Sequence, residues 1–229
     1  MIPRWLKRRI HQNRLRDQAY QFLFEPGPED EVVVFDCETT GHNLATDDIV
    51  AIAALKVRGT RILASERFVA VARPDAEMGA AAIKTHRLLK SDVAEGGKFY
   101  DILPAFLKFI GGRPLVGYYN EFEIAMVDKY LRPFLGVELP NPQIEVSRIY
   151  YERKYAKAPP GSTIDLSFAS MLRDLEIPLL EEHDAFNRAL MTAEAFVVLQ
   201  DYQRRDIRIG RQEPLAAKAA APAYGPGQG

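Results

Sequence analysis

Two acidic residues two positions apart follow the most apolar strand-like run of the chain. Residues 32–35 form that run, Asp36 and Glu38 come next, and the sequence Thr39-Thr40-Gly41 marks a turn. Because successive side chains of a strand point to opposite faces, Asp36 and Glu38 share one face and Cys37 takes the other. Two carboxylates on one face can hold a hard divalent cation between them. An Asp-x-Glu pattern alone has low specificity, and an exposed strand end that leads into a turn is the alternative.

Two later segments carry further acidic and histidine residues. Residues 115–123 read Leu-Val-Gly-Tyr-Tyr-Asn-Glu-Phe-Glu, and residues 182–190 read Glu-His-Asp-Ala-Phe-Asn-Arg-Ala-Leu. Together with residues 33–41, these ordered segments resemble the three motifs of the DnaQ-like 3'-5' exonuclease superfamily. Residues 83–86, Ile-Lys-Thr-His, are similar to a stretch that family members carry between the first two motifs. The resemblance implies a ribonuclease H-like fold that acts on the 3' ends of single-stranded DNA or RNA.

The resemblance also implies a role for each acidic and histidine position. Asp36, Glu38 and Glu123 match metal ligands, and Asp36 and Glu38 are expected to be catalytic as well. His183 matches the histidine that accepts a proton from the attacking water, a task that suits an unperturbed pKa of about 6.5. The expected cofactor is Mg or Mn, as one or two ions that support phosphodiester hydrolysis. Without the resemblance, a histidine near a helix start is a cap or a packed polar group.

Two of the four acidic ligand positions differ from the active members of the family. In those members the second motif ends in Phe-Asp, and in the third motif an Asp follows the His after four residues. This chain has Glu123 and Arg188 at these two positions. Glutamate adds one methylene of reach, and a misplacement of about 1 Å can cost on the order of a hundredfold in rate. Arginine exchanges an anionic ligand for a permanent cation. We therefore expect weak or absent metal binding and attenuated hydrolysis.

Arg188 has two interpretations. Its planar set of donors can neutralise Asp36, Glu38 and Glu123, so that a salt bridge stands where a metal ion stands in the family. Alternatively, it pairs with Asp184 four residues earlier on an exposed helix face, where such a pair stabilises by a few tenths of a kcal/mol. The register of the third motif favours the first interpretation.

Substrate-binding residues are expected at the turn after the first strand and at the second motif. Thr39, Gly41 and His42 lie at the turn, where family members often carry a hydrophobic residue that wedges against the terminal base. Tyr118 and Tyr119 stand where many members have His-Asn. An aromatic side chain there can stack on a base, which is worth roughly 1 to 3 kcal/mol. Either tyrosine can instead fill the core after a buried strand.

Apolar periodicity predicts the elements that position these residues. Strand-like runs cover 32–36, 49–57, 62–72 and 114–118, and helical patterns cover 98–110, 121–135, 164–175 and 184–204. This order fits an α/β fold with a mixed β-sheet flanked by helices, in a single domain. We place the domain at residues 31–205, after a basic amphipathic segment and linker at 1–30 and before a flexible Ala/Pro/Gly-rich tail at 206–229. The loop 154–161, with two lysines, is a phosphate-contacting flap or an ordinary surface loop.

Composition and charge narrow the cellular setting. A single cysteine excludes an internal disulfide framework, and no apolar run is long enough to span a membrane. Basic residues break up the N-terminus before a signal-peptide core can form, so we expect a cytoplasmic protein. The net charge of −1 hides six Lys or Arg within residues 1–16, which leaves −7 on the rest of the chain. Such a body is unsuited to gripping long duplexes by phosphate neutralisation.

Three functional hypotheses follow. The first is a metal-dependent 3'-5' exonuclease with an altered site and attenuated activity. The second is a catalytically inactive exonuclease fold that binds nucleic-acid ends or a partner protein, the latter through its basic N-terminal helix. A third, supported only by residues 4–16, is a basic amphipathic anchor on anionic membrane surfaces. The choice between DNA and RNA, and the oligomeric state, are left open by the sequence.

Overall fold

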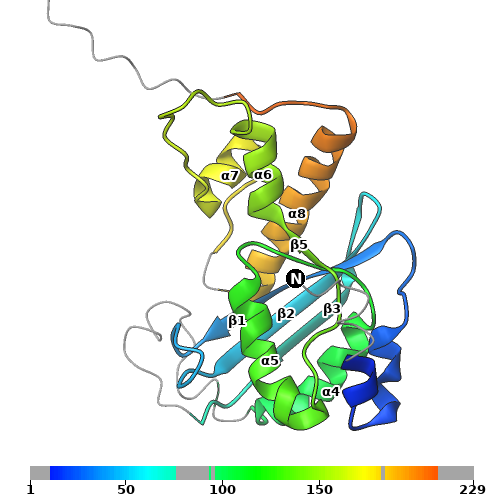
Figure 1. Cartoon of the computed structure of the whole chain (residues 1–229). Coiled ribbons are helices and arrows are strands. Elements are labelled where there is room, and N and C mark those ends of the chain that lie inside the picture. The colour runs from blue at the N-terminus through cyan, green and yellow to red at the C-terminus, as the bar shows by residue number, and fades with distance from the viewer. Residues whose placement is uncertain (1–10, 76–92, 94–95, 182–183, 211–229) are drawn as a thin grey trace, which may run out of the picture.

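A five-stranded mixed sheet forms the centre of the molecule (Figure 1). The computed structural model describes residues 11–75, 93, 96–181 and 184–210. Within them the strand order is β3-β2-β1-β4-β5, with β1, β2 and β3 antiparallel and β1, β4 and β5 parallel. The strands are β1 (Glu31–Thr39), β2 (Ile49–Arg58), β3 (Arg61–Val71), β4 (Leu115–Gly117) and β5 (Gln143–Glu145).

The central strand β1 is covered on both faces. Val33 and Phe35 join one apolar cluster, whereas Val34 joins another. This is the alternation that a strand imposes on its side chains. A strand buried on both faces reads as a continuous apolar run, which explains why residues 32–35 carry no polar side chain.

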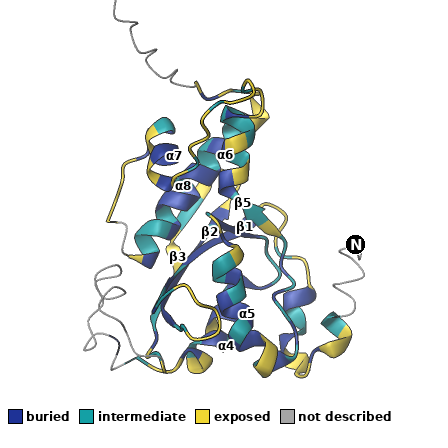
Figure 2. Ribbon diagram, turned by 60° about the vertical axis from the view of Figure 1, so that its left-hand side comes forward, coloured by how far each residue is buried: buried dark blue, intermediate teal, exposed yellow. Residues whose placement is uncertain are grey.

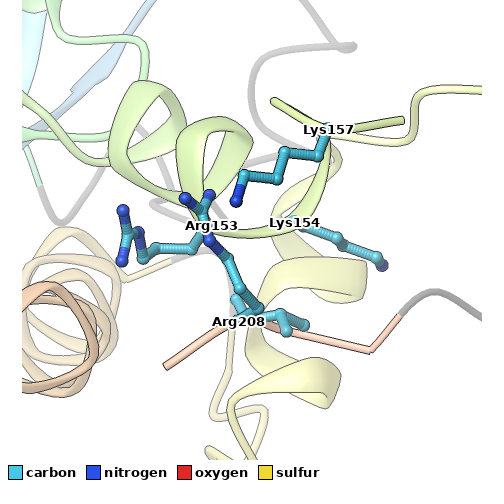
Figure 3. A pocket seen from close by; sticks show the side chains of 5 residues that line it. Arg153, Lys154, Lys157 and Arg208 are labelled. Atoms are coloured by element: carbon cyan, nitrogen blue, oxygen red, sulfur yellow. The ribbon is translucent and has the colours of Figure 1, made fainter. Parts of the chain in front are cut away.

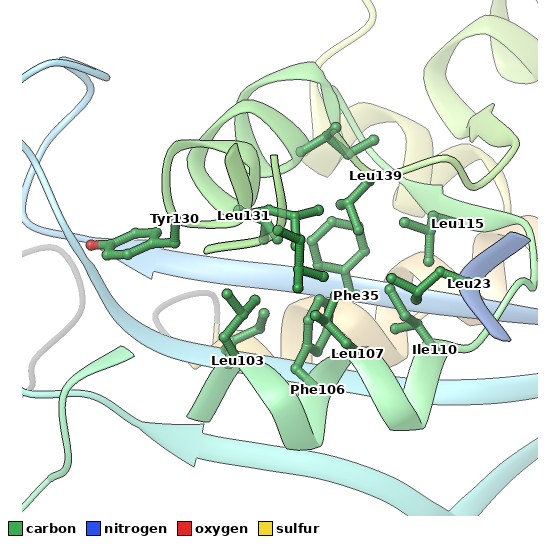
Figure 4. Close-up of a cluster of buried hydrophobic side chains, with 14 of the residues drawn as sticks. Leu23, Phe35, Leu103, Phe106, Leu107, Ile110, Leu115, Tyr130, Leu131 and Leu139 are labelled. Carbon is green, nitrogen blue, oxygen red and sulfur yellow. The ribbon is translucent and has the colours of Figure 1, made fainter. Parts of the chain in front are cut away.

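One face of the sheet is covered by α4 (Phe99–Ile110), α5 (Glu121–Leu135) and the 3-10 helix η1 (Gln18–Phe24). Their apolar side chains meet those of β1 in the cluster of Figure 4, where the Phe35 and Phe106 rings lie 5.7 Å apart. Leu23 from η1 and Leu131 from α5 belong to the same cluster. This packing fixes the N-terminal turn of α5 relative to the end of β1.

On the opposite face, α8 (Ala185–Arg204) packs on the sheet, while α6 (Val146–Lys154) and α7 (Phe168–Asp174) pack against α8 and contribute to the same apolar cluster. Figure 2 shows that much of α8 is buried. Ala189, Ala193 and Phe196 are among its buried residues. Small residues on a helix let its backbone approach a sheet closely. The start of α8 is therefore held near the strands that end at the candidate site.

Residues 15–24 pack on the domain. Leu15, Leu23 and Phe24 are buried, and the Arg16 amide donates to the Leu135 carbonyl at the end of α5 (3.0 Å). A Cβ on Gly112 would lie 1.7 Å from the Glu25 carbonyl oxygen, so this contact requires glycine. The described part of the N-terminal segment is thus docked, while residues 1–10 lie outside the described residues. The domain boundary at residue 30 stays a prediction.

The predicted α/β fold with a mixed sheet and flanking helices is confirmed. All four expected strands and the helices at 98–110, 121–135 and 184–204 appear within a few residues of their expected bounds. The helix expected at 164–175 is shorter, because α7 begins only at Phe168. The sequence did not predict β5 or α6. The tail from residue 211 onward lies outside the described residues.

Candidate active site

Two carboxylates near the C-terminal end of β1 lie beneath the first turns of α8. Asp36 and Glu38 are buried, with exposed fractions of 6% and 9%. Their pairing partners on the neighbouring strand β2 are Ala53 and Ala51, respectively. These two alanines also contact Ala185 at the start of α8. Small residues therefore surround the acidic pair and leave room for α8 to bring a side chain to them.

That side chain is Arg188. The Asp184 side chain caps α8 by accepting hydrogen bonds from the Phe186 and Asn187 amides (2.8 and 3.0 Å). One turn later Arg188 Nε donates to Asp36 Oδ1 at 3.3 Å, and its guanidinium lies 5.1 Å from the centre of the Phe168 ring. Arg188 thus pairs with Asp36, and Asp184 serves as the helix cap. The alternative of a surface pair between Asp184 and Arg188 is not realised.

Glu123 reaches the same region from the first turn of α5. Glu123 Oε2 and Asp36 Oδ2 are both buried and have no hydrogen-bond partner among the described residues. Burial, followed by repulsion from Asp36, raises the pKa of Glu123 to about 8 and that of Glu38 to about 7. Burial also raises the pKa of Asp36 to about 6, against the opposing effect of Arg188. The single arginine leaves this group of acids short of positive charge.

The donor set fits a metal site only in part. The two unpartnered carboxylate oxygens are hard donors suited to Mg or Mn. However, no three His, Cys, Asp or Glu side chains within the described ranges come together closely enough to hold a metal ion. Arg188 also occupies Asp36 Oδ1, the remaining oxygen of that carboxylate. The residues fit one cation at most, and they do not fit a pair of cations.

The turn after β1 is built by short polar contacts. Thr39 Oγ1 donates to the Gly41 carbonyl (2.7 Å). The Asp47 carboxylate accepts from Thr40 Oγ1 (3.0 Å), and a Cβ on Gly41 would lie 2.6 Å from Asp47 Oδ2. His42 is exposed, and its ring centre lies 5.5 Å from that of Phe122, next to Glu123. The turn therefore brings His42 to the start of α5.

The two tyrosines of the second motif have different surroundings. Tyr118 is half-buried, donates its hydroxyl to the Leu166 carbonyl (2.6 Å) and packs on Phe168 (4.8 Å). Tyr119 is 53% exposed, and its ring lies edge-on to that of Tyr118 at 4.7 Å. Its φ of 52° lies in the left-handed region, which tyrosine rarely adopts. Tyr118 thus serves packing, while Tyr119 leaves its ring open to solvent.

Glu145 holds this strained segment, and sequence reasoning missed it. Its carboxylate accepts hydrogen bonds from the amides of Tyr119 and Asn120 (2.9 and 3.0 Å), and also from the amide and hydroxyl of Ser147 (3.0 and 2.8 Å). Glu145 therefore fixes both the second motif and the start of α6. The sequence gives little indication of this role, because Glu145 ends a strand that is too short to show a periodic pattern.

His183 lies outside the described residues, so its predicted position relative to the carboxylates is untested. The adjacent Asp184 is described and is exposed. Of the predicted site residues, the structure brings together Asp36, Glu38, Glu123 and Arg188. Tyr118 lies near them, because its ring and the Arg188 guanidinium both contact the Phe168 ring.

Comparison with protein families and curated proteins relates this geometry to known sequences. The model of the RNase_T exonuclease family matches residues 33–196. DNA polymerase III subunit epsilon of Aquifex aeolicus is 25% identical over 165 residues, which cover 72% of this chain and 78% of that protein. A PolC-type DNA polymerase III of Caldanaerobacter subterraneus subsp. tengcongensis is 28% identical over 177 residues, or 76% of this chain. The match spans only 12% of that polymerase.

Solved structures share the fold. Exonuclease X, solved in complex with 5' overhanging duplex DNA, gives a TM-score of 0.58 at 21% identity, over 76% of this chain and 93% of that one. Exonuclease I of E. coli, solved with a dT13 oligonucleotide, gives a TM-score of 0.64 at 14% identity, over 77% of this chain and 42% of that one. At these identities the likeness concerns the fold alone.

Proposed function

The chain belongs to the RNase_T exonuclease family and is a 3'-5' exonuclease-family protein, and we propose that it binds the 3' end of single-stranded DNA or RNA. It hydrolyses the bound strand at an attenuated rate. The observation that carries the attenuation is the 3.3 Å contact between Arg188 Nε and Asp36 Oδ1. A guanidinium placed there neutralises the buried carboxylate that the family uses for a metal ion. It cannot supply the Lewis acidity of a metal.

The family motifs assign Asp36, Glu38 and Glu123 as the residues that would hold a single Mg or Mn ion, and the three side chains would have to move closer together to do so. When bound, such an ion stabilises negative charge that develops on the phosphodiester in the transition state. The raised pKa values of the three acids support a site that has too little positive charge without an ion. Because Arg188 competes for Asp36, binding of the ion is weak.

The remaining residues orient the strand and move the proton. His183 accepts the proton of the attacking water, in the role that the family motif gives it. Thr39, Gly41 and His42 line the approach to the carboxylates from the turn after β1. Tyr119 offers its exposed ring to a base near the 3' end.

A second candidate function is a catalytically inactive module that binds the same 3' ends. It is favoured by one observation: the described residues contain no group of three metal-ligand side chains close enough to hold an ion. The two candidates differ in whether any hydrolysis remains. They share the binding of an end.

A comparison of linear and circular DNA tests this shared claim. Fluorescence anisotropy in chelator would measure binding of a labelled linear oligo(dT), with unlabelled linear or circular oligo(dT) of the same length as competitors. We expect the linear competitor to be at least about tenfold more effective. Tyr119→Ala should weaken binding by about tenfold, within the range for loss of one stacked base. Tyr100→Ala, which removes an exposed tyrosine from α4, is the matched control.

Equal competition by the circle would contradict recognition of an end. Release of mononucleotides separates the two candidate functions. Slow release after Mn is added would favour the attenuated enzyme, and no release at any Mn concentration would favour the inactive module.

No helix in the described part of the chain is long and apolar enough to cross a membrane. A cytoplasmic location, and a protein partner for the basic N-terminal segment, remain proposals from the sequence.

A further inference from the structure

A small basic pocket lies at the C-terminal end of α6, where the chain leaving α8 passes over it (Figure 3). Its volume is about 230 Å³. Four of its five lining residues are cationic: Arg153, Lys154, Lys157 and Arg208, with Ile209 as the fifth. None of these residues belongs to the candidate active site.

The pocket is held in shape by bonds to the last turn of α6. The Ile209 amide donates to the Arg153 carbonyl (3.2 Å), and Arg208 Nη1 donates to the Glu152 carbonyl (2.5 Å). Carbonyls in the last turn of a helix have no partner within the helix. Residues 208 and 209 supply these partners and so fasten the segment after α8 to α6. The position of the pocket is therefore fixed by one backbone bond and one side-chain bond to α6.

Two of the four cations have a carboxylate partner. Arg153 Nη1 pairs with Asp206 (3.0 Å), and Lys154 pairs with Asp174. The end of a helix also favours cations because its carbonyl dipoles point there. Arg153 and Lys154 therefore need no ligand to account for their presence.

Lys157 and Arg208 are different. Both are exposed, and neither has a carboxylate partner within the part of the chain that the structure describes. In Figure 3 their charged ends point toward one another, while Lys154 turns away. Arg153 Nε is buried beside them and has no hydrogen-bond partner among the described residues. Like charges that converge on one pocket, next to an unused buried donor, favour an anion between them.

We propose that this pocket binds a phosphate group through Arg153, Lys157 and Arg208. A tetrahedral anion offers several acceptor oxygens, which suits one ammonium and two guanidinium groups. The pocket lies beyond the C-terminal end of α8, whereas Arg188 lies in its second turn. The helical rise of 1.5 Å per residue puts about 24 Å between residues 188 and 204. The pocket is therefore a second site, separate from the candidate active site. It binds either free phosphate or a phosphodiester group of a bound strand.

Calorimetric titration of the full chain with inorganic phosphate, at constant ionic strength, tests the site directly. Lys157→Gln/Arg208→Gln should weaken phosphate binding by about tenfold or more. Arg148→Gln, which removes an exposed arginine from α6 outside the pocket, should leave it unchanged. Lys157→Glu alone is the fallback if loss of the Arg208 bond to α6 disturbs folding.

Titration with single-stranded oligo(dT) at several salt concentrations separates the two sources of phosphate. If a strand reaches the pocket, the double variant should lower the slope of log K against log salt by about 0.7 for each lost phosphate contact. An unchanged slope with weakened inorganic phosphate binding assigns the pocket to free phosphate. Binding of both probes by the double variant as tightly as by the wild type overturns the proposal, and so does failure of both probes to bind the wild type.

Discussion

The two ends of β1 hold buried carboxylates in opposite electrostatic states. At the start of the strand, Glu31 is 2% exposed and accepts hydrogen bonds from Arg58 Nε (2.9 Å) and Arg113 Nε (2.6 Å). At its end, Asp36 has one arginine at 3.3 Å and one oxygen with no partner among the described residues. Burial acts to raise the pKa of both acids. The two arginines overcome it and lower the pKa of Glu31, whereas the pKa of Asp36 rises to about 6.

This difference separates a structural ion pair from a binding site. Each oxygen of Glu31 is satisfied within the fold, so the charge is stabilised without a ligand. At the other end, burial and then repulsion from Asp36 raise the pKa values of Glu38 and Glu123, and the three acids share a single guanidinium. Groups that the fold leaves unsatisfied are those that a ligand can satisfy. The strand therefore anchors the sheet at one end and presents the candidate site at the other.

Glu31→Gln should have the largest effect on stability. It leaves two arginines without their carboxylate, and we expect a loss of about 2 to 3 kcal/mol at pH 7, less than for a fully buried pair because Arg58 is half-exposed. The lowered pKa of Glu31 means that its contribution is present above the unfolded-state value of 4.5 and is lost as the pH falls through the folded-state pKa. Denaturant unfolding at pH 7 and pH 3 would measure the difference. Equal losses at both pH values would contradict the ion-pair account.

Glu123→Gln should have a smaller effect of opposite sign. The folded-state pKa of Glu123 is raised to about 8, so the wild type loses stability as the pH rises from 4.5 toward 8. The glutamine side chain of the variant stays uncharged at every pH. The variant should therefore be more stable than the wild type at pH 8 by on the order of 1 to 2 kcal/mol in chelator. At pH 4 the two proteins should be alike. If the stabilities of the wild type and Glu123→Gln changed in parallel from pH 4 to pH 8, the predicted contrast with Glu31 would be contradicted.

Tyr119→Gly should have the smallest effect and extends the comparison to the backbone. The left-handed conformation at Tyr119 costs about 1 to 2 kcal/mol for a residue with a Cβ, and glycine avoids it but loses more chain entropy on folding. We expect stability to rise by less than about 1 kcal/mol while binding of single-stranded DNA weakens. Thermal unfolding and anisotropy would measure the two effects. A clear loss of stability would show that the Tyr119 ring serves packing.

The sequence predicts the long, regular parts of this fold well. The apolar runs that became β1 and β2, and the alternation that places Asp36 and Glu38 on one face, follow from local periodicity. β5 contains only Gln143–Glu145 and is too short to show a period, and α6 carries mainly polar and charged residues instead of an apolar stripe. Such elements are specified by tertiary contacts.

The candidate site shows the same limit. The inward orientation of Arg188 was predicted from the register of a motif, and the structure has it in contact with Asp36. The bonds from Tyr119 and Asn120 to Glu145 join residues about 25 positions apart, and no local pattern indicates them. The left-handed Tyr119 runs against the intrinsic preference of tyrosine, so a propensity argument predicts the wrong conformation there. The roles of His183, Thr39, Gly41 and His42 stay predictions.

We propose that Arg188 occupies the place of a metal ligand and thereby slows hydrolysis. The most direct test of this claim is mononucleotide release from end-labelled single-stranded DNA and RNA in Mn, Mg or chelator, with the wild type and Arg188→Asp compared. We expect slow or absent release by the wild type and a rate higher by about a hundredfold for Arg188→Asp. That gain should require metal and disappear in His183→Ala/Arg188→Asp. Rapid metal-dependent release by the wild type, with no gain in Arg188→Asp, would contradict the claim.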